Sequence, residues 1–234
     1  MKPIDHLAFD IETVPFKPLS QYSDSAQEQL TRRIARAAEH DPEMTYEKFA
    51  SLNADLGRII CISIGSVHNG KIHTKSFSGE DERAILMDFN EVMGRVDGPY
   101  IHYNGLGFDV PFILRRMCHH AMRPANPRFA NQKRYQYEPH LDVMGCYYNW
   151  DMRSTLPLGL LAETHGLPTP KADLSGDKVY GAYLNGEWDR IRRYCELDVA
   201  TTLQLWRKVI RFEEPAECDL FDEHFEVPKA GAVV

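Results

Sequence analysis

The chain has 234 residues, of which 43% are hydrophobic, and its formal net charge at pH 7 is −7. This size allows one substantial core, and the negative charge argues against a protein that coats nucleic acid, although not against an acidic site filled by metal ions. No apolar run reaches 18 residues and the N-terminus lacks the apolar segment of a signal peptide, so neither a membrane span nor secretion is expected. Five scattered cysteines, none spaced as CxxC, favour reduced thiols in the cytoplasm.

The predicted elements form a mixed sheet. Residues 4–11, 58–67 and 71–77 read as strands, and Asn69-Gly70 between the last two is a strong hairpin signal. The later elements, in chain order, are a helix from about 79 to 96, a strand at 99–104, a helix at about 108–121, a short strand at 137–144 and helices at 156–165 and 187–212. Three antiparallel strands followed by alternating helices and strands indicate an α/β fold, with a mixed central sheet of about five strands flanked by helices.

The remaining segments set the expected domain organisation. Residues 17–57 are polar and helical in pattern, and we interpret them as an insertion over the sheet edge rather than as a second domain. We therefore expect a single domain over residues 1–212 and an acidic C-terminal tail at 213–234.

Two carboxylates lie in the first predicted strand. Asp10 and Glu12 are two residues apart, so they project to the same side of the strand. They repel each other unless a cation or a proton joins them. The plain alternative for an isolated pair of this kind is a strand end where both acids reach water. For a lone pair this alternative usually applies, and only further acidic residues with defined neighbours would favour a metal site at the end of this strand.

Other acidic residues follow in the chain. Asp109 closes the stretch NGLGFD after a predicted strand, where an N-cap is the simple alternative. Tyr194 and Asp198 are four residues apart in a predicted helix and share one face; the alternative is a surface pair. Each of these signals is weak alone.

The acidic residues and their neighbours form three motifs, and the order of these motifs along the chain is a specific signal. Asp-Ile-Glu-Thr at 10–13, Asn-x-x-x-Phe-Asp at 104–109 and Tyr-x-x-x-Asp at 194–198 resemble the three exonuclease motifs of the tyrosine-bearing (DEDDy) branch of the DEDD superfamily. The residues within each motif are similar to those of the proofreading exonuclease of family B DNA polymerases. They are also similar to those of stand-alone bacterial proteins described as predicted exonucleases related to that domain. The resemblance extends from about residue 4 to residue 212.

The resemblance implies a ribonuclease H-like fold and a metal-dependent 3′–5′ exonuclease. Such an enzyme releases nucleoside 5′-monophosphates from single-stranded or frayed 3′ ends of DNA. It further implies that Asp10 bridges two divalent cations, Mg²⁺ or Mn²⁺, and that Glu12 and Asp198 complete the site of the cation that activates water. Asp109 would act on the second cation through water, and Tyr194 would orient the attacking water.

The resemblance also suggests substrate contacts. Asn104 and Phe108 would position the terminal nucleotides, and Thr13 would lie beside the terminal sugar. Lys171 could contact a phosphate, although a solvated loop lysine is as good an interpretation. A basic segment between residues 111 and 138 could steer a polyanion, or could be a solvated helix face followed by a loop; it contains Arg115, Arg116, Arg123, Arg128, Lys133 and Arg134.

Several alternatives stay open from the sequence. The same chemistry could act on RNA. A nuclease-dead module that only binds nucleic acid is a different class of function, but all four acidic residues and Tyr194 are present. For Asp142, a structural hydrogen bond is favoured over support of the metal site. The tail stretch 217–221, ECDLF, only vaguely resembles peptides that bind the sliding clamp, because Glu217 and Cys218 depart from that pattern.

Overall fold

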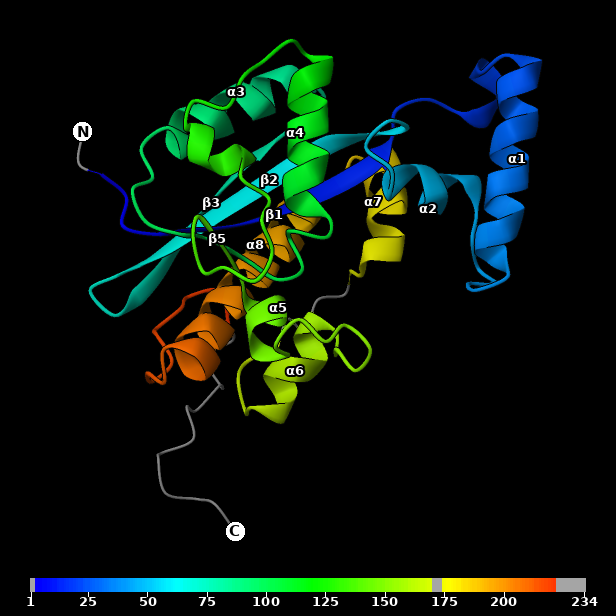
Figure 1. Cartoon of the computed structure of the whole chain (residues 1–234). Helices are drawn as coiled ribbons and strands as arrows, with labels where there is room; N and C mark the ends of the chain where they lie inside the picture. Colours follow the sequence, from blue (N-terminus) through cyan, green and yellow to red (C-terminus); the bar gives the residue numbers. More distant parts are fainter. Residues whose placement is uncertain (1–2, 170–173, 222–234) are drawn as a thin grey trace.

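The structure is a computed structural model that describes residues 3–169 and 174–221 (Figure 1). Its centre is a five-stranded sheet in the order β3-β2-β1-β4-β5. The strands are β1 (Leu7–Pro15), β2 (Gly57–His68), β3 (Lys71–Ser78), β4 (Tyr100–His102) and β5 (His140–Asp142). β1, β2 and β3 pair antiparallel, whereas β4 runs parallel to β1 and β5 runs parallel to β4. This confirms the predicted mixed sheet and the ribonuclease H-like α/β fold.

Eight α-helices are found in the described part of the chain: α1 (Asp24–Ala38), α2 (Tyr46–Ser51), α3 (Glu82–Met93), α4 (Asp109–His119), α5 (Val143–Tyr147), α6 (Leu158–Thr164), α7 (Val179–Leu184) and α8 (Trp188–Leu205). α8 continues into a π-helical turn, Trp206–Ile210, and the 3-10 turns are η1 (Leu19–Gln21), η2 (Pro127–Ala130) and η3 (Gly176–Lys178). α5 and α7 were not predicted, because helices this short show no full apolar stripe. The strand expected at 137–144 ends at Asp142, whose carboxylate accepts a hydrogen bond from the Gly145 N–H (3.1 Å) and so starts α5.

The two faces of the sheet carry different helices. α3 and α4 lie on one face, and α8 crosses the other, with α5 and α6 near it (Figure 1). The alternation of side chains along β1 explains the division: Phe9 and Ile11 join the core under α3 and α4, whereas Ala8 packs with the residues of α8. The next residues on the α8 side of β1 are Asp10 and Glu12.

β1 is longer than predicted at its carboxyl end. It continues through the fully buried Val14 and pairs with β2 as far as Pro15 and Gly57. The expectation that the strand ends at its carboxylates was therefore wrong, because the length of β2 lets the pairing continue past them. A register shift between Glu12 and Thr13 marks a bulge in this pair, a feature that re-aims side chains and is common next to active sites.

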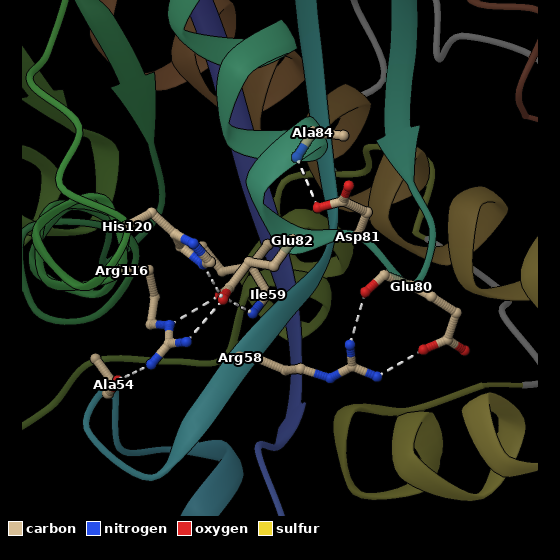
Figure 2. A network of polar contacts seen from close by, with 9 residues as sticks. All are labelled: Ala54, Arg58, Ile59, Glu80, Asp81, Glu82, Ala84, Arg116 and His120. Atoms are coloured by element: carbon tan, nitrogen blue, oxygen red, sulfur yellow. Dashed lines mark hydrogen bonds and ion pairs between the residues drawn. The ribbon is translucent and has the colours of Figure 1, made fainter.

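A buried ion pair joins the start of α3 to α4 (Figure 2). The Glu82 carboxylate accepts two hydrogen bonds from Arg116 (2.9 and 2.7 Å) and one from the backbone N–H of Ile59 (2.7 Å). A ring nitrogen of His120 lies 2.8 Å from the same carboxylate. Arg116 is only 2% exposed, which corrects its placement in a basic surface segment: its charge is used inside the protein.

The insertion packs at the end of the sheet. The Thr13 hydroxyl donates a hydrogen bond to the Ser51 carbonyl of α2 (2.7 Å), and the Phe16 N–H donates to the carbonyl of Leu56 (2.8 Å). α1 contacts α2 and stands away from the sheet (Figure 1). The insertion is therefore helical, as expected, but it covers the end of β1 rather than an edge strand.

The described part of the predicted tail joins the domain. The Gln204 side chain of α8 bonds to both the carbonyl and the N–H of Ala216 (2.6 and 2.8 Å), and Glu217 forms a bridge to the start of β3. Leu220 and Phe221 pack against the core beside α8. The stretch that vaguely resembles a clamp-binding peptide is thus held against the sheet. Among the described residues, no helix has the length and apolar content needed to cross a bilayer.

Candidate active site

Three carboxylates meet on the α8 face of β1. Asp10 and Glu12 project to this face, while Ile11 between them enters the opposite core. The backbone N–H of Ile11 donates a hydrogen bond to the carboxylate of Asp109 (3.2 Å). That bond holds the first residue of α4 against the middle of β1, so residues almost one hundred positions apart become neighbours.

α8 contributes a fourth carboxylate. The charge of Asp198 acts on both Asp10 and Glu12, and Tyr194, one turn earlier on the helix, hydrogen-bonds to the Asp198 side chain. The helical spacing predicted that these two residues share a face, and the structure places that face over the carboxylates of β1.

A thiol lies beside the same group. The sulfur of Cys195 is 3.5 Å from both the backbone carbonyl and the carboxylate of Asp10. Ligand atoms of Asp10, Glu12 and Cys195 all lie within 4.8 Å of one another. The Cys195 thiol is therefore a hydrogen-bond donor to Asp10.

The electrostatics of the site favour a cation. Burial, followed by the charges of neighbouring acids, raises the pKa values of Asp10 and Glu12 well above the ordinary range. Burial raises the pKa of Asp109 to about 6, and it raises that of Asp198 to about 7 although the Tyr194 hydrogen bond opposes the rise. Each ionised carboxylate is disfavoured here because of burial and like charge. A divalent cation would relieve this repulsion, and carboxylate oxygens are the donors that Mg²⁺ and Mn²⁺ prefer. The residues present fit such ions.

The loop before α4 is held by Asp142. Its carboxylate accepts hydrogen bonds from the backbone N–H groups of Asn104 (3.0 Å) and Leu106 (3.1 Å). The Gly105 N–H donates to Nδ1 of His102 (3.1 Å), and a Cβ at Gly105 would meet that imidazole ring at 2.4 Å. Asp142 therefore has the structural role favoured for it, and it fixes the backbone that leads into Asp109.

The residues expected to contact substrate have different surroundings in the structure. The Asn104 side chain lies over Gly107 in the loop just described, and Phe108 packs its ring on Phe112 (5.4 Å between centroids). Thr13 follows Glu12 in β1, and its hydroxyl is engaged by Ser51. Arg115 is 59% exposed on α4, and its charged partner is Asp55 (3.8 Å) rather than any of the four carboxylates. Lys171 lies outside the described residues.

Two neighbours of the site were not predicted. Cys195 lies three residues before Asp198, which places both on one face of α8. His102 lies two residues before Asn104 on β4, and its charge lowers the pKa of Asp109 against the larger effect of burial. The helical spacing that paired Tyr194 with Asp198 could also have found Cys195, whereas no local spacing links His102 to a carboxylate.

A large cavity lies elsewhere on the described part of the chain. It measures about 850 Å³ and is lined by residues around the starts of β1 and β4, including His6, Pro99 and Trp206. None of the four carboxylates lines it. A much smaller cavity lies beside the loop at Asn104 and Gly107, next to α5.

A protein-family model matches residues 49–230, and its description is "Predicted 3'-5' exonuclease related to the exonuclease domain of PolB". The match includes Asp109, Tyr194 and Asp198 and begins after Asp10 and Glu12, which the fold brings to the same place. No curated protein matches the chain.

Proposed function

Because this chain belongs to the family of predicted 3′–5′ exonucleases related to the exonuclease domain of PolB, we propose that it hydrolyses the phosphodiester bond at the 3′ end of DNA. The products are nucleoside 5′-monophosphates. The observation that carries this proposal is the convergence of Asp10, Glu12, Asp109 and Asp198, with the Tyr194 hydroxyl, from three distant parts of the chain. The family gives a nuclease that acts on nucleic acid; DNA is the proposed substrate, and RNA is the alternative.

The carboxylates have a common task. Asp10, Glu12, Asp109 and Asp198 would hold two divalent cations, Mg²⁺ or Mn²⁺, which would supply charge stabilisation and lower the pKa of a water. Asp10 would hold the ions from the centre of the group, since the charges of the other three carboxylates all act on it. The Ile11 N–H and the Cys195 thiol restrict the carboxylates of Asp109 and Asp10 before any ion binds.

Tyr194 orients the attacking water. Burial, and then the charge of Asp198, raise the pKa of its hydroxyl, so the hydroxyl keeps its proton at neutral pH. A protonated phenol can donate one hydrogen bond to the Asp198 carboxylate and accept another from a water. Tyr194 is therefore suited to positioning and not to acting as a base.

The burial of the site sets the form of the substrate. Glu12 and Asp109 are 7% and 4% exposed, so a phosphodiester bond inside a duplex cannot reach them. The terminal nucleotides must first leave the duplex, and Asn104, Phe108 and Thr13 would hold them. Single-stranded and frayed 3′ ends are the preferred substrates.

One assay tests this function against its alternatives. Single-stranded DNA, duplex DNA with a mismatched 3′ end and RNA of the same sequence are incubated with Mg²⁺ and either the wild type or Asp10→Ala. We expect nucleoside 5′-monophosphates from both DNA substrates with the wild type and only background with the variant. Faster release from RNA would favour the exoribonuclease, and tight binding without turnover would favour the nuclease-dead module.

A further inference from the structure

The members of the predicted basic segment have different surroundings. Arg115, Arg116 and Arg128 each pair with an acidic side chain. Arg134, in contrast, forms no ion pair with any of the described residues. It lines the small cavity beside the active-site loop together with Asn104. An unpaired arginine in that place is available to an anion from outside the protein.

An aromatic pair, one member of which lines this cavity, lies beside it. Trp150 lines it, and the ring of Tyr135 packs against Trp150 with 5.2 Å between centroids. The ring of Trp150 packs directly on Gly145, so closely that a Cβ at Gly145 would approach the ring to 2.7 Å. Tyr135 is 75% exposed. The protein thus presents an exposed aromatic ring on a rigid support.

The backbone around the cavity is held in an uncommon conformation. Of the seven non-glycine residues with positive φ in the described part of the chain, Asn104 (62°) and Trp150 (62°) line this cavity, and Tyr135 (64°) and Asn149 (50°) directly adjoin lining residues in the chain. Bulky residues adopt such angles rarely. They persist where the surrounding structure forces them, which is frequent at ligand-binding sites.

The cavity lies beside the loop that leads into the candidate active site. Asn104 and Gly107 line it, and the loop that they belong to runs directly into Asp109 at the start of α4. Asp142, which also lines the cavity, holds that loop through the Asn104 N–H. The loop that ends at Asp109 therefore joins the surroundings of this cavity to the candidate active site.

We propose that Arg134, Tyr135 and Trp150 form a platform for an unpaired nucleotide on the 5′ side of the scissile bond. Its base stacks on the exposed ring of Tyr135 and its phosphate pairs with Arg134. Proteins bind single strands through this combination of aromatic faces and positive charge, and they do so with little regard to sequence because every base has a π-face. The inference rests on the proposed exonuclease function and adds a reason for preferring single strands, since bases inside a duplex cannot stack on a side chain.

Two substrates separate the platform from the catalytic groups. One is an oligothymidylate of about a dozen nucleotides, long enough to cover a typical single-strand site. The other is the p-nitrophenyl ester of thymidine 5′-monophosphate, whose leaving group replaces the upstream nucleotide and cannot reach the platform. The variants are Tyr135→Ala and Arg134→Gln. The matched controls are Phe212→Ala, an 88% exposed aromatic side chain at the large distant cavity, and Arg32→Gln on α1, whose side chain is 71% exposed.

The expected result is a change in the ratio of kcat/KM for the oligonucleotide to kcat/KM for the ester. Loss of one stacking contact should lower this ratio at least about fivefold in Tyr135→Ala, mainly through a higher KM, and Arg134→Gln should lower it and weaken its salt dependence. The controls should keep the wild-type ratio. Ratios in Tyr135→Ala and Arg134→Gln equal to those of the controls would overturn the platform and leave the proposed function intact. A wild type that hydrolyses neither substrate would overturn both.

An abasic residue moved along the oligonucleotide locates the stacked base. In the wild type, one upstream position should raise KM when its base is missing. In Tyr135→Ala the same missing base should have little further effect, because the ring that it stacks on has been removed. Equal sensitivity to the missing base in the two proteins would show that the base contacts another part of the surface and would overturn the assignment of Tyr135.

Discussion

Replacing Arg116 by Met should destabilise the protein far more than the same replacement at the adjacent Arg115. Glu82 is 5% exposed, and Arg116 donates two of the hydrogen bonds to its carboxylate (Figure 2). Arg116→Met leaves the carboxylate buried with His120 and the Ile59 N–H as its remaining partners. Arg115 is 59% exposed and lies 3.8 Å from Asp55. Its replacement therefore removes only a solvent-exposed ion pair.

General magnitudes translate this difference into melting temperatures. Removing one partner of a buried ion pair costs about 3–5 kcal/mol, whereas a surface pair contributes about 0–1 kcal/mol. In a protein of this size each kcal/mol shifts the melting temperature by about 2–4 °C. We therefore expect Arg116→Met to lose about 6–20 °C and Arg115→Met to lose no more than about 4 °C. Thermal unfolding followed by circular dichroism at neutral pH measures both.

The pH dependence gives a second signature. Burial alone would raise the pKa of Glu82, but the hydrogen bonds from Arg116, His120 and Ile59 outweigh it and hold the pKa below the ordinary value. Because the folded pKa is depressed, the pair contributes its stability above the ordinary carboxyl pKa and loses it as the pH falls. The deficit of Arg116→Met should shrink in acid, where Glu82 becomes neutral, and Glu82→Gln in the same chain should restore part of the loss. Equal losses in the two arginine variants would refute this account of the ion pair.

Three further predictions concern the active site. Without divalent cations, Asp198→Asn should be more stable than the wild type at about pH 8, and this difference should shrink as the pH falls below about 7 and vanish only near the ordinary carboxyl pKa of about 4, because the pKa of Asp198 is raised to about 7 in the folded protein; a difference in melting temperature that grows toward acid would contradict this sign. In single-turnover assays Asp198→Ala should fall to near background, whereas Tyr194→Phe should lose roughly 10²–10³-fold, the scale for one preorganised donor, and keep its metal affinity in a titration. Asp142→Ala should leave the N–H groups of Asn104 and Leu106 without their acceptor, at about 1–3 kcal/mol each, so both stability and activity should drop; an unchanged unfolding midpoint in denaturant would count against this role.

Local periodicity was enough to predict the sheet. The alternation in residues 58–67 and 71–77 and the Asn-Gly turn gave the β2–β3 hairpin, because each signal depends on neighbouring residues. The same reasoning stopped the first strand at Ile11, because the polar Glu12 and Thr13 interrupt its apolar run. Only pairing with β2, about fifty residues away in the chain, shows that the strand continues to Pro15.

Long-range contacts explain why Arg116 was wrongly predicted to belong to a basic surface segment. Arg115 and Arg116 look alike in the sequence, and the burial of Arg116 depends on Glu82, at the start of another helix. The carboxylates could be found because three motifs occur in a recognisable order. The hydrogen bonds of Cys195 and Asp142 could not be found, because they depend on how α8 and the loop before α4 pack against β1 and β5.

The direction of hydrolysis and its dependence on metal test the central claim most directly. A single-stranded oligonucleotide labelled at its 3′ end, the same strand labelled at its 5′ end and a closed single-stranded circle are incubated with Mg²⁺ and either the wild type or Asp10→Asn. The account predicts that the 3′ label leaves first as a mononucleotide, that the 5′ label stays on a progressively shorter strand, that the circle stays intact, and that chelation or Asp10→Asn stops the reaction. Cutting of the circle, first release of the 5′ label, or full activity of Asp10→Asn would contradict it.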